Sequence, residues 1–404
     1  MATEHGGAAA CNVNVAVRAR PLLDWEEQSR CVEVLCDGTA QVGRNPGDDK
    51  HLIASSCPRF VFDRGFGTES SQQELFEWVQ PAIDGCFEGY NAAILAYGQT
   101  GSGKTYSMGT AAIGLVVPEE MGLVPRAFQH IAAGIQKRGD EAEFEMRASF
   151  VEVHDDNVND LLADPGTSTD VIIREDARGE VILVGATEAE AKNCDDLLRL
   201  LERGTLSRTT AATRMNATSS RSHAVLTLVI EQRRRPGSAS RQRGQPERVR
   251  AKLQLVDLAG SERNKRTGTT GKHFKESVNI NQGLLALANC INVLSDESAQ
   301  RVGMHVPYRD HKLTRLLRNS LGGNARTYML ACCSVSASNF QETLNTLRYA
   351  ARARNIKNTP VVNRGDDDDQ LAKMEREMAT LKRELSEAAE DPSGLMAQIQ
   401  SLRE

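Results

Sequence analysis

An eight-residue stretch, GQTGSGKT at residues 98–105, has the residue types and the spacing of a phosphate-binding loop. Its glycines let backbone N–H groups curl around an anion, and the lysine and threonine at its end suit the terminal phosphates and a magnesium ion. The helix expected to begin here points its positive end at the phosphates. The residues of the loop are Gly98, Gln99, Thr100, Gly101, Ser102, Gly103, Lys104 and Thr105.

The stretch before the loop decides between two interpretations of it. NAAILAY, residues 91–97, is a short apolar run that predicts a buried strand. Strand, loop, helix is the order that a phosphate-binding loop requires, whereas a glycine-rich turn before a helix needs no such strand. We therefore favour phosphate binding.

Two stretches further along the chain are suited to complete such a site. NATSSRSH, residues 216–223, is hydroxyl-rich and fits a sensor of a γ-phosphate, with an exposed turn as the simpler alternative. KLQLVDLAGSE, residues 252–262, predicts a buried strand ending in Asp257, where an acid would hold magnesium through water. Gly260 follows on a turn, where its amide would face the γ-phosphate. The phosphate loop and these two stretches, in this order, are stronger evidence for a nucleotide site than any one of them alone.

The composition fits one large α/β domain with a tail. The chain has 404 residues, 40% of them hydrophobic, which is enough for a large core. Its nine cysteines form no C-x-x-C pair, so neither a zinc site nor a disulfide framework is predicted and a reducing cytosol is the default. No apolar run approaches the ~20 residues of a membrane helix, and the N-terminus lacks a signal pattern. We expect a soluble, intracellular protein.

Charge is segregated along the chain, although the net charge is only −5. Residues 140–196 hold 17 acidic and 4 basic side chains, whereas residues 301–357 hold 10 Lys/Arg and 2 acidic ones. The basic stretch predicts a footprint for an acidic surface, with a solvated face as the alternative. Residues 233–250 carry seven arginines and one acid, which predicts a disordered hairpin insertion, with nucleic-acid contact as the minority interpretation.

Apolar periodicity predicts strands and helices on both sides of the loop. Further strands are expected at residues 13–21, 59–67, 144–154, 179–188, 224–232 and 326–336. Helices are expected at residues 70–89, 195–208, 280–294, 307–324 and 338–358. The second would end near Gly204, the fourth would have Asp310 as its cap, and the fifth would begin with a capping box of Ser338 and Gln341.

A proline and an acidic run separate this domain from a short tail. Pro360 ends the last expected helix, and residues 366–369 are four aspartates. Apolar residues from Leu371 to Ala388 keep a 3,4 repeat. Proline inside a helix costs ~3 kcal/mol, so a break is expected near Pro392. The chain stops within a heptad, which suggests a fragment of something longer.

The chain resembles the kinesin motor domain from about Val13 to Asn363. The resemblance is carried by RARP at residues 18–21, AYGQTGSGKT, NATSSRSH, LVDLAGSE and PYRDHKLTRLLRNSLGGN. RTTAATRMN, LNTLRYAARARNIKN and PVVN look most like the chromokinesin-type, kinesin-4-like group. The resemblance implies a single P-loop NTPase domain, with a central, mostly parallel twisted sheet flanked by helices on both faces, and a C-terminal helical neck.

The same resemblance divides the chain. It implies a flexible N-terminal segment at residues 1–12, a motor domain at 13–358, a neck linker and acidic linker at 359–369, and a helical neck at 370–404, a short coiled-coil candidate interrupted at Pro392. Residues 1–10 are rich in glycine and alanine, which have poor β propensity, so we expect little strand pairing between this segment and the neck linker.

By resemblance, ATP and Mg²⁺ are the cofactors and each site residue has a role. The adenine would be clamped by Arg18, Pro21 and Tyr106, and the nucleotide would also contact Asn216. Ser219 and Ser220 would contact the γ-phosphate and magnesium, and Thr105 and Asp257 would complete the metal site. Arg221 would pair with Glu262 to position the attacking water, beside Gly260.

The resemblance also implies that microtubules are the partner. The residues facing the acidic tubulin surface would be Arg263, Arg266, Lys275, Arg309, Lys312 and Arg315. The chain departs from the family pattern at His311, where serine is usual, at Asn319, where aspartate is usual, and at Gln282, which replaces a common basic residue. Microtubule affinity is therefore expected to lean on residues 309–318.

Two classes of function follow. The first is an ATP-hydrolysing microtubule motor of the cytoplasm and cytoskeleton that moves toward the plus end. Control of the dynamics of microtubule ends is a further activity open to such a motor. The second is a non-motile microtubule-binding module with a regulatory nucleotide site. The C-terminal helix offers a route to a homodimer, and neither a membrane nor nucleic acid is expected as a partner of this fragment.

Overall fold

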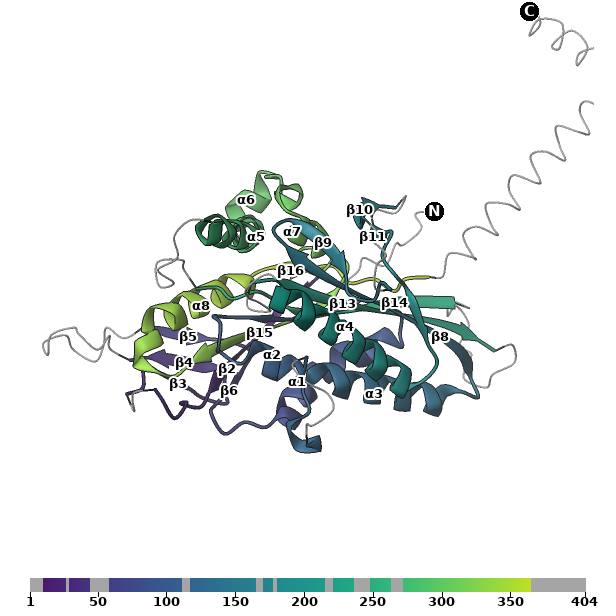
Figure 1. Cartoon of the computed structure of the whole chain (residues 1–404), viewed down its shortest axis with the longest axis horizontal. Coiled ribbons are helices and arrows are strands. Elements are labelled where there is room, and N and C mark those ends of the chain that lie inside the picture. The colour runs from purple at the N-terminus through teal and green to yellow at the C-terminus, as the bar shows by residue number, and fades with distance from the viewer. Residues whose placement is uncertain are drawn as a thin grey trace, which may run out of the picture.

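The computed structural model describes residues 10–26, 29–43, 58–110, 117–164, 170–176, 180–214, 221–235, 248–262 and 272–364, without the side chains of 211–214 and 272–281. Within these residues the fold is a mixed sheet between two layers of helices (Figure 1). No helix among them is both long and apolar enough to cross a membrane.

The main sheet has nine strands in the order β12, β8, β13, β14, β7, β15, β2, β6, with β9 paired to β8. Their bounds are β2 (Asn14–Arg20), β6 (Arg64–Phe66), β7 (Ala92–Tyr97), β8 (Ala142–His154), β9 (Asn157–Asp160), β12 (Ala189–Ala191), β13 (His223–Arg234), β14 (Arg248–Asp257) and β15 (Arg326–Ser334). All six residues of β7 are buried, as its apolar sequence predicts for a central strand.

The sheet is mixed rather than mostly parallel, which corrects the sequence-based expectation. From β14 through β7, β15 and β2 to β6 the pairings are parallel. From β14 through β13 and β8 to β12 they are antiparallel. Two of the antiparallel pairings join strands that follow each other in the chain, β13 with β14 and, through Asp155 and Asp156, β8 with β9.

Helices cover both faces of the sheet, as expected for an α/β domain. One face packs against α1 (Gln72–Cys86), α2 (Lys104–Met108), α3 (Leu123–Arg138) and α4 (Cys194–Arg214). The other face packs against α5 (Lys272–Ser295), α7 (Lys312–Leu316) and α8 (Phe340–Ala353), and α6 (Glu297–Arg301) follows α5 (Figure 1). Alternate residues of β7 serve the two layers, with Ile94 on the first and Leu95 on the second.

Three small strand groups lie beside the main sheet. They are the pair β1 (Cys11–Asn12) and β16 (Lys357–Asn358), the hairpin β10 (Ile172–Glu175) and β11 (Val181–Val184), and the sheet β3 (Val32–Val34), β4 (Thr39–Val42) and β5 (Arg59–Val61). The single strand expected at residues 59–67 is therefore two strands in different sheets. Asp63 makes the switch, because its backbone N–H bonds Val15 at 2.9 Å and its carboxylate accepts from Val15 at 2.8 Å.

Helix α4 continues ten residues beyond Gly204, where the sequence predicted its end. A Cβ atom at Gly204 would lie 2.1 Å from the ring of Phe150 on β8. This glycine thus allows a close helix–sheet approach and does not act as a terminator.

Two predicted helix caps are wrong. Residues 307–324 form a 3₁₀ turn (Tyr308–Asp310) followed by the five-residue α7, whose cap is His311 through a 3.1 Å bond from the backbone N–H of Leu313 to Nδ1. Helix α8 begins after another 3₁₀ turn (Ala337–Asn339), and it ends at Ala353 rather than near residue 358. The residue before the helix is Asn339 rather than Ser338, and its side chain makes no cap hydrogen bond, while the hydroxyl of Ser338 bonds Ser336 at 2.9 Å.

Candidate nucleotide-binding site

The phosphate loop lies between the central strand β7 and the short helix α2. Gly98, Gly101 and Gly103 have positive φ angles of 149°, 75° and 96°. At Gly98 the space is as restrictive as the angle, because a Cβ atom there would lie 2.1 Å from the carbonyl oxygen of Cys332 on β15. The neighbouring strand therefore requires glycine here, and the loop wraps closely over the end of the sheet.

Lys104, the first residue of α2, is folded over the loop. Its ammonium group donates 2.9 Å hydrogen bonds to the carbonyl oxygens of Gly98 and Gln99. The side chain is buried, and burial lowers the pKa of Lys104 below its ordinary value. A desolvated cation held at the loop can exchange these carbonyl oxygens for the oxygens of a phosphate.

Thr105 and Asp257 form the pair expected for a metal site. Because β14 and β7 are parallel neighbours, their carboxyl ends meet and place Asp257 beside α2. The hydroxyl of Thr105 donates a 2.8 Å hydrogen bond to Oδ2 of Asp257. Oδ1 is buried and has no hydrogen-bond partner among the described residues. This oxygen donor set fits Mg²⁺, which would neutralise charge on the phosphates when bound there.

The turn after β14 folds against the phosphate loop. The backbone N–H of Ser261 donates a 3.1 Å hydrogen bond to the carbonyl of Gly98. Glu262 accepts a 2.7 Å bond from the backbone N–H of Thr100 and a further bond from its hydroxyl. A Cβ atom on Gly260 would lie 2.4 and 2.6 Å from the carboxylate oxygens of Glu262, so only glycine permits this packing.

Glu262 and Arg221 do not pair in this structure. Among the described residues, the hydrogen-bond partner of the Glu262 side chain is Thr100. The Arg221–Glu262 pair implied by the resemblance therefore remains a prediction for another nucleotide state. Asn216, Ser219 and Ser220 lie outside the described residues, so their expected contacts also remain predictions.

A buried network that the sequence patterns did not single out supports Asp257. Arg208 of α4 lies 3.5 Å from Oδ2 of Asp257 and donates a 2.8 Å hydrogen bond to the carbonyl of Ser222. The hydroxyl of Ser222 donates a 2.5 Å bond to Glu152 of β8. Buried charges are costly unless paired, so these residues depend on one another. In the sequence Arg208 is one arginine within a helical pattern and Glu152 is one glutamate within a strand pattern. Their spacing alone does not indicate that they interact.

His223 joins the hydroxyl-rich run to the turn after β14. Its Nδ1 accepts a 3.0 Å hydrogen bond from the backbone N–H of Ala259. Burial, assisted by the nearby charges of His311, Arg208 and Lys104, lowers the pKa of His223 to about 3. The imidazole is therefore neutral at physiological pH and keeps the acceptor that this backbone bond requires.

The residues expected at the adenine lie at the edge of the same loop. The guanidinium of Arg18 donates 2.8 Å hydrogen bonds to Gln72 and Ser107, and it lies 5.3 Å from the ring centroid of Tyr106. Burial lowers the pKa of Arg18. Tyr106 is 50% exposed, so part of this residue is accessible to a flat base.

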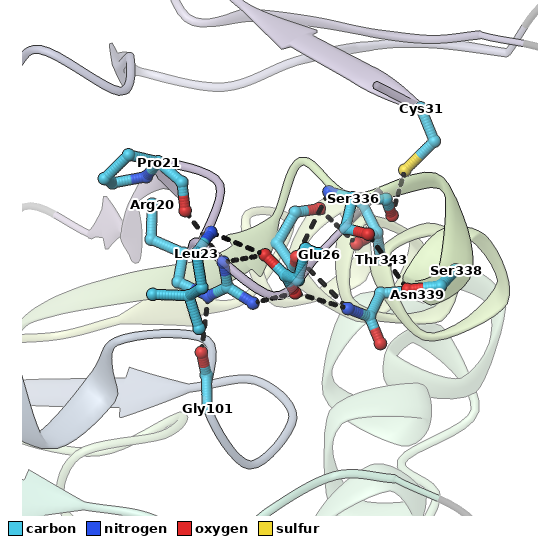
Figure 2. A network of polar contacts seen from close by, with 11 residues as sticks. Arg20, Pro21, Leu23, Glu26, Cys31, Gly101, Ser336, Ser338, Asn339 and Thr343 are labelled. Carbon is cyan, nitrogen blue, oxygen red and sulfur yellow. Dashed lines mark hydrogen bonds and ion pairs between the residues drawn. The ribbon is translucent and has the colours of Figure 1, made fainter. Parts of the chain in front are cut away.

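A second network, shown in Figure 2, joins the loop to the start of α8. Arg20 donates a 2.6 Å hydrogen bond to the carbonyl of Gly101 and binds both carboxylate oxygens of Glu26 at 2.5 and 2.6 Å. Glu26 also accepts a 3.3 Å bond from Asn339, the residue before α8. The hydrogen bond from Arg20 lowers the pKa of Glu26. Arg20 further donates to the carbonyl of Pro21 at 2.7 Å, which holds that residue beside the loop.

The basic stretch is partly structural. Arg309 is exposed, whereas Arg315 donates a 2.8 Å hydrogen bond to the carbonyl of Ile173 on β10. Asn319 donates a 2.9 Å bond to Glu180, which immediately precedes β11. Lys312 begins α7, and its backbone N–H bonds Asp156 at 2.8 Å. Arg263 and Arg266 lie outside the described residues, and so does the side chain of Lys275.

The segment after β16 lies along the core rather than apart from it. Val361 donates its backbone N–H to the Asn324 side chain at 2.7 Å. Asn363 bonds Gly89 through its backbone N–H at 2.9 Å and through its side chain at 2.8 Å. The N-terminal strand β1 pairs with Lys357 and Asn358, not with residues 360–362. Residues 1–9, whose strand pairing was expected to be weak, lie outside the described residues.

The phosphate loop, the Thr105–Asp257 pair and the turn at Gly260 define an α/β nucleotide-binding protein of the P-loop class. The sequence profile of the kinesin motor domain matches residues 18–356. The chain belongs to the kinesin motor-domain family.

Named relatives and solved structures agree with this membership. The chain is 42% identical to a kinesin-like protein KIN-4A of Oryza sativa subsp. japonica over 100% of the chain and 41% of the relative. It is 43% identical to kinesin-like protein kif7 of Danio rerio over 95% of this chain and 27% of that relative. The chain thus spans about a quarter to two fifths of the length of these relatives.

Two solved structures share the fold. One, described as a fast kinesin, has 34% identity and a TM-score of 0.75, covering 87% of this chain and 94% of its own. The other is a KIF14 dimer with AMP-PNP in complex with a microtubule, at 36% identity and a TM-score of 0.76, covering 91% and 100%.

Proposed function

We propose that this chain is a microtubule-stimulated ATPase that works as a motor, with ATP and Mg²⁺ as cofactors. The observation that carries the proposal is the convergence of Lys104, the Thr105–Asp257 pair and Glu262 on one phosphate loop. A site kept only for nucleotide binding would not need Glu262 held against the loop. The neighbour solved with AMP-PNP on a microtubule supports the same nucleotide class and partner.

Each residue has a role in the proposed reaction. Lys104 would bind the terminal phosphates, and Thr105 and Asp257 would hold the metal, with Ser220 as a further ligand. Glu262, released from Thr100, would pair with Arg221 and position water for attack on the γ-phosphate. Positioning and electrostatic stabilisation provide most of the catalysis in phosphoryl transfer, so these residues need no covalent role.

Microtubule contact would come from the face that carries α5, α6 and α7. The candidate residues are those of the loop before α5 together with Arg309, Lys312 and Arg315. Docking of residues 359–364, the proposed neck linker, would transmit the change of nucleotide state to the residues that follow it in the chain. Plus-end direction, control of microtubule ends, dimerisation through residues 370–404 and a place on the cytoplasmic cytoskeleton are further parts of this proposal.

The alternative is a non-motile microtubule-binding module with a regulatory nucleotide site. The two are separated by steady-state ATPase measured with and without microtubules, beside single-molecule motility on the same preparation. Stimulated turnover with directed movement is the expected result. Nucleotide-dependent binding with no stimulated turnover would support the alternative and overturn the motor proposal.

A further inference from the structure

Lys252 of β14 connects the docked segment, residues 359–364, with the β10–β11 hairpin. Its backbone N–H donates a 2.9 Å hydrogen bond to the side-chain oxygen of Asn91. The same oxygen accepts a 3.1 Å bond from the side chain of Asn363 in the docked segment. Through its side chain, Lys252 donates a 3.1 Å bond to Oε2 of Glu180 at the hairpin. The surroundings of this one residue therefore depend on both elements.

Glu180 receives two donors at one carboxylate oxygen. Besides Lys252, the side-chain amide of Asn319 donates a 2.9 Å hydrogen bond to Oε2. The backbone N–H of Glu180 bonds the carboxylate of Asp176 at 2.8 Å, and the backbone N–H of Asp176 bonds the carbonyl of Glu180 at 2.9 Å. The end of the hairpin is thus closed on itself, and it presents the carboxylate of Glu180 to the ammonium group in a charge-assisted hydrogen bond.

The hairpin is joined to the region of α7 at two further points. Arg315 of α7 donates a 2.8 Å hydrogen bond to the carbonyl of Ile173, and Arg318, just after α7, pairs with Glu175 at 2.7 Å. These contacts hold β10 beside α7, as Figure 1 shows. Because Arg315 is one of the proposed microtubule contacts, the hairpin belongs to that face of the domain. Glu180 is therefore the point at which this face meets the strand that supports the docked segment.

The docked segment also borders the ion pair of Lys252 and Glu180. Residues 361–364 line a cavity of about 400 Å³ together with these two side chains. The side chains of Lys252 and Glu180 are only 19% and 21% exposed. An ion pair weakens as water gains access to it, because the effective dielectric constant rises. Release of the docked segment would therefore remove the bond of Asn363 to Asn91 and also weaken the hold of Glu180 on Lys252.

We propose that Glu180 is a positioning residue that couples docking of residues 359–364 to the β10–β11 hairpin, through Lys252 and Asn91. Docking would tighten the hairpin, and a hairpin held at the proposed microtubule face would in turn favour docking. The inference deepens the role proposed above for residues 359–364 and rests on it. The coupling lies within one chain and requires no turnover, so it is measured separately from ATPase activity.

Backbone hydrogen exchange of the full chain tests the coupling in both directions. It is measured under the condition in which the wild-type docked segment exchanges slowest, with or without AMP-PNP. Glu180→Gln should speed exchange at residues 361–364 about two- to fivefold, the scale of one ion pair. Asn363→Ala should speed exchange in β10 and β11 by a similar factor, because coupling between two sites is reciprocal.

The matched control is Glu188→Gln, which removes the same charge from an exposed residue shortly after β11 and should change neither element. Helix α3, on the opposite face of the sheet, serves as the internal reference for general destabilisation. An equal rise of exchange in α3 would show that the variants loosen the whole domain, and this would overturn the coupling.

Exchange of the two charges provides the second arm. E180K and K252E should each speed exchange in the docked segment and in the hairpin, and the double variant should restore slow exchange in both. Faster exchange confined to the hairpin in E180K and E180Q would make Glu180 a local support only, and absence of rescue would exclude the pair. Either result would overturn the coupling. Failure of the proposed motor function has a different signature, because wild-type turnover would then not respond to microtubules, whatever the exchange rates.

Discussion

The carboxylate of Glu262 is hydrogen-bonded to Thr100 of the phosphate loop, through both the backbone N–H and the hydroxyl. In this arrangement the expected partner of Glu262, Arg221, is not bonded to it among the described residues. Glu262 thus contacts the phosphate loop here, whereas the proposed mechanism needs it at Arg221. We infer that exchange of Glu262 between Thr100 and Arg221 accompanies the proposed catalytic cycle.

Substitution of Glu262 by alanine should reduce microtubule-stimulated turnover by ~10²-fold, since water positioning is lost. Nucleotide affinity should change little, because Lys104 and the loop amides remain. Stopped-flow binding of a fluorescent ATP analogue, beside steady-state ATPase, measures both. Near-normal turnover in this variant would remove Glu262 from the mechanism.

Glu26 and Arg20 should act together on nucleotide retention, since Arg20 is the link to the carbonyl of Gly101. Glu26→Gln and Arg20→Lys should each speed ADP release by about tenfold, the scale of one charge-assisted hydrogen bond. The double variant should be no worse than either single one. ADP release kinetics test this, with the exposed Glu69→Gln as control, and additive effects would refute a shared contact.

Neutralising Arg309, Lys312 and Arg315 together should raise the microtubule concentration for half-maximal ATPase and weaken its salt dependence. Arg315→Ala alone should also lower the melting temperature, because it frees the carbonyl of Ile173 on the β10–β11 hairpin. Alanine at Arg199 and Arg203 on α4, which covers the opposite face of the sheet, is the matched control. A fall in basal ATPase alone would mean that the patch is structural.

Asn363→Ala should impair movement under load while sparing ATPase, because its side chain and backbone make the bonds to Gly89. Glycine at Val361 or Val362 should matter less, since these side chains are 43% and 37% exposed. Deleting residues 1–9 should change velocity and stall force little, because it leaves the β1 pairing of Cys11 and Asn12 in place. An optical trap compares these variants, and a large loss of stall force in the deletion would show that the segment contributes.

His223 should make stability depend on pH below neutrality. Its pKa is about 3 in the folded protein and ~6.5 when unfolded, so the unfolded chain binds the extra proton between these values. Stability is then full above about pH 6.5 and falls by up to ~1.4 kcal/mol per unit as pH drops toward 3. His223→Asn, which keeps an acceptor for Ala259, should flatten this slope in urea unfolding between pH 7.5 and about 5. An unchanged slope would contradict the prediction.

The sequence by itself determined the parts of this protein that are local. The phosphate loop, its strand and helix, and Asp257 at the end of a buried strand follow from spacing and hydrophobic pattern, because backbone geometry and burial are encoded within a few residues. For the same reason the capping box of α1 at Ser71 and Glu74 formed within the expected helix.

The tertiary structure decided what depends on neighbours distant in sequence. The sequence predicts a helix end at Gly204, but in the structure this glycine packs closely against the ring of Phe150. The 59–67 strand divides because Asp63 bonds Val15 of another sheet. Glu262 could be assigned to the site from sequence, but not its bond to Thr100, 162 residues earlier in the chain. Such pairings are selected by burial and desolvation across the packed domain, and no local pattern records them.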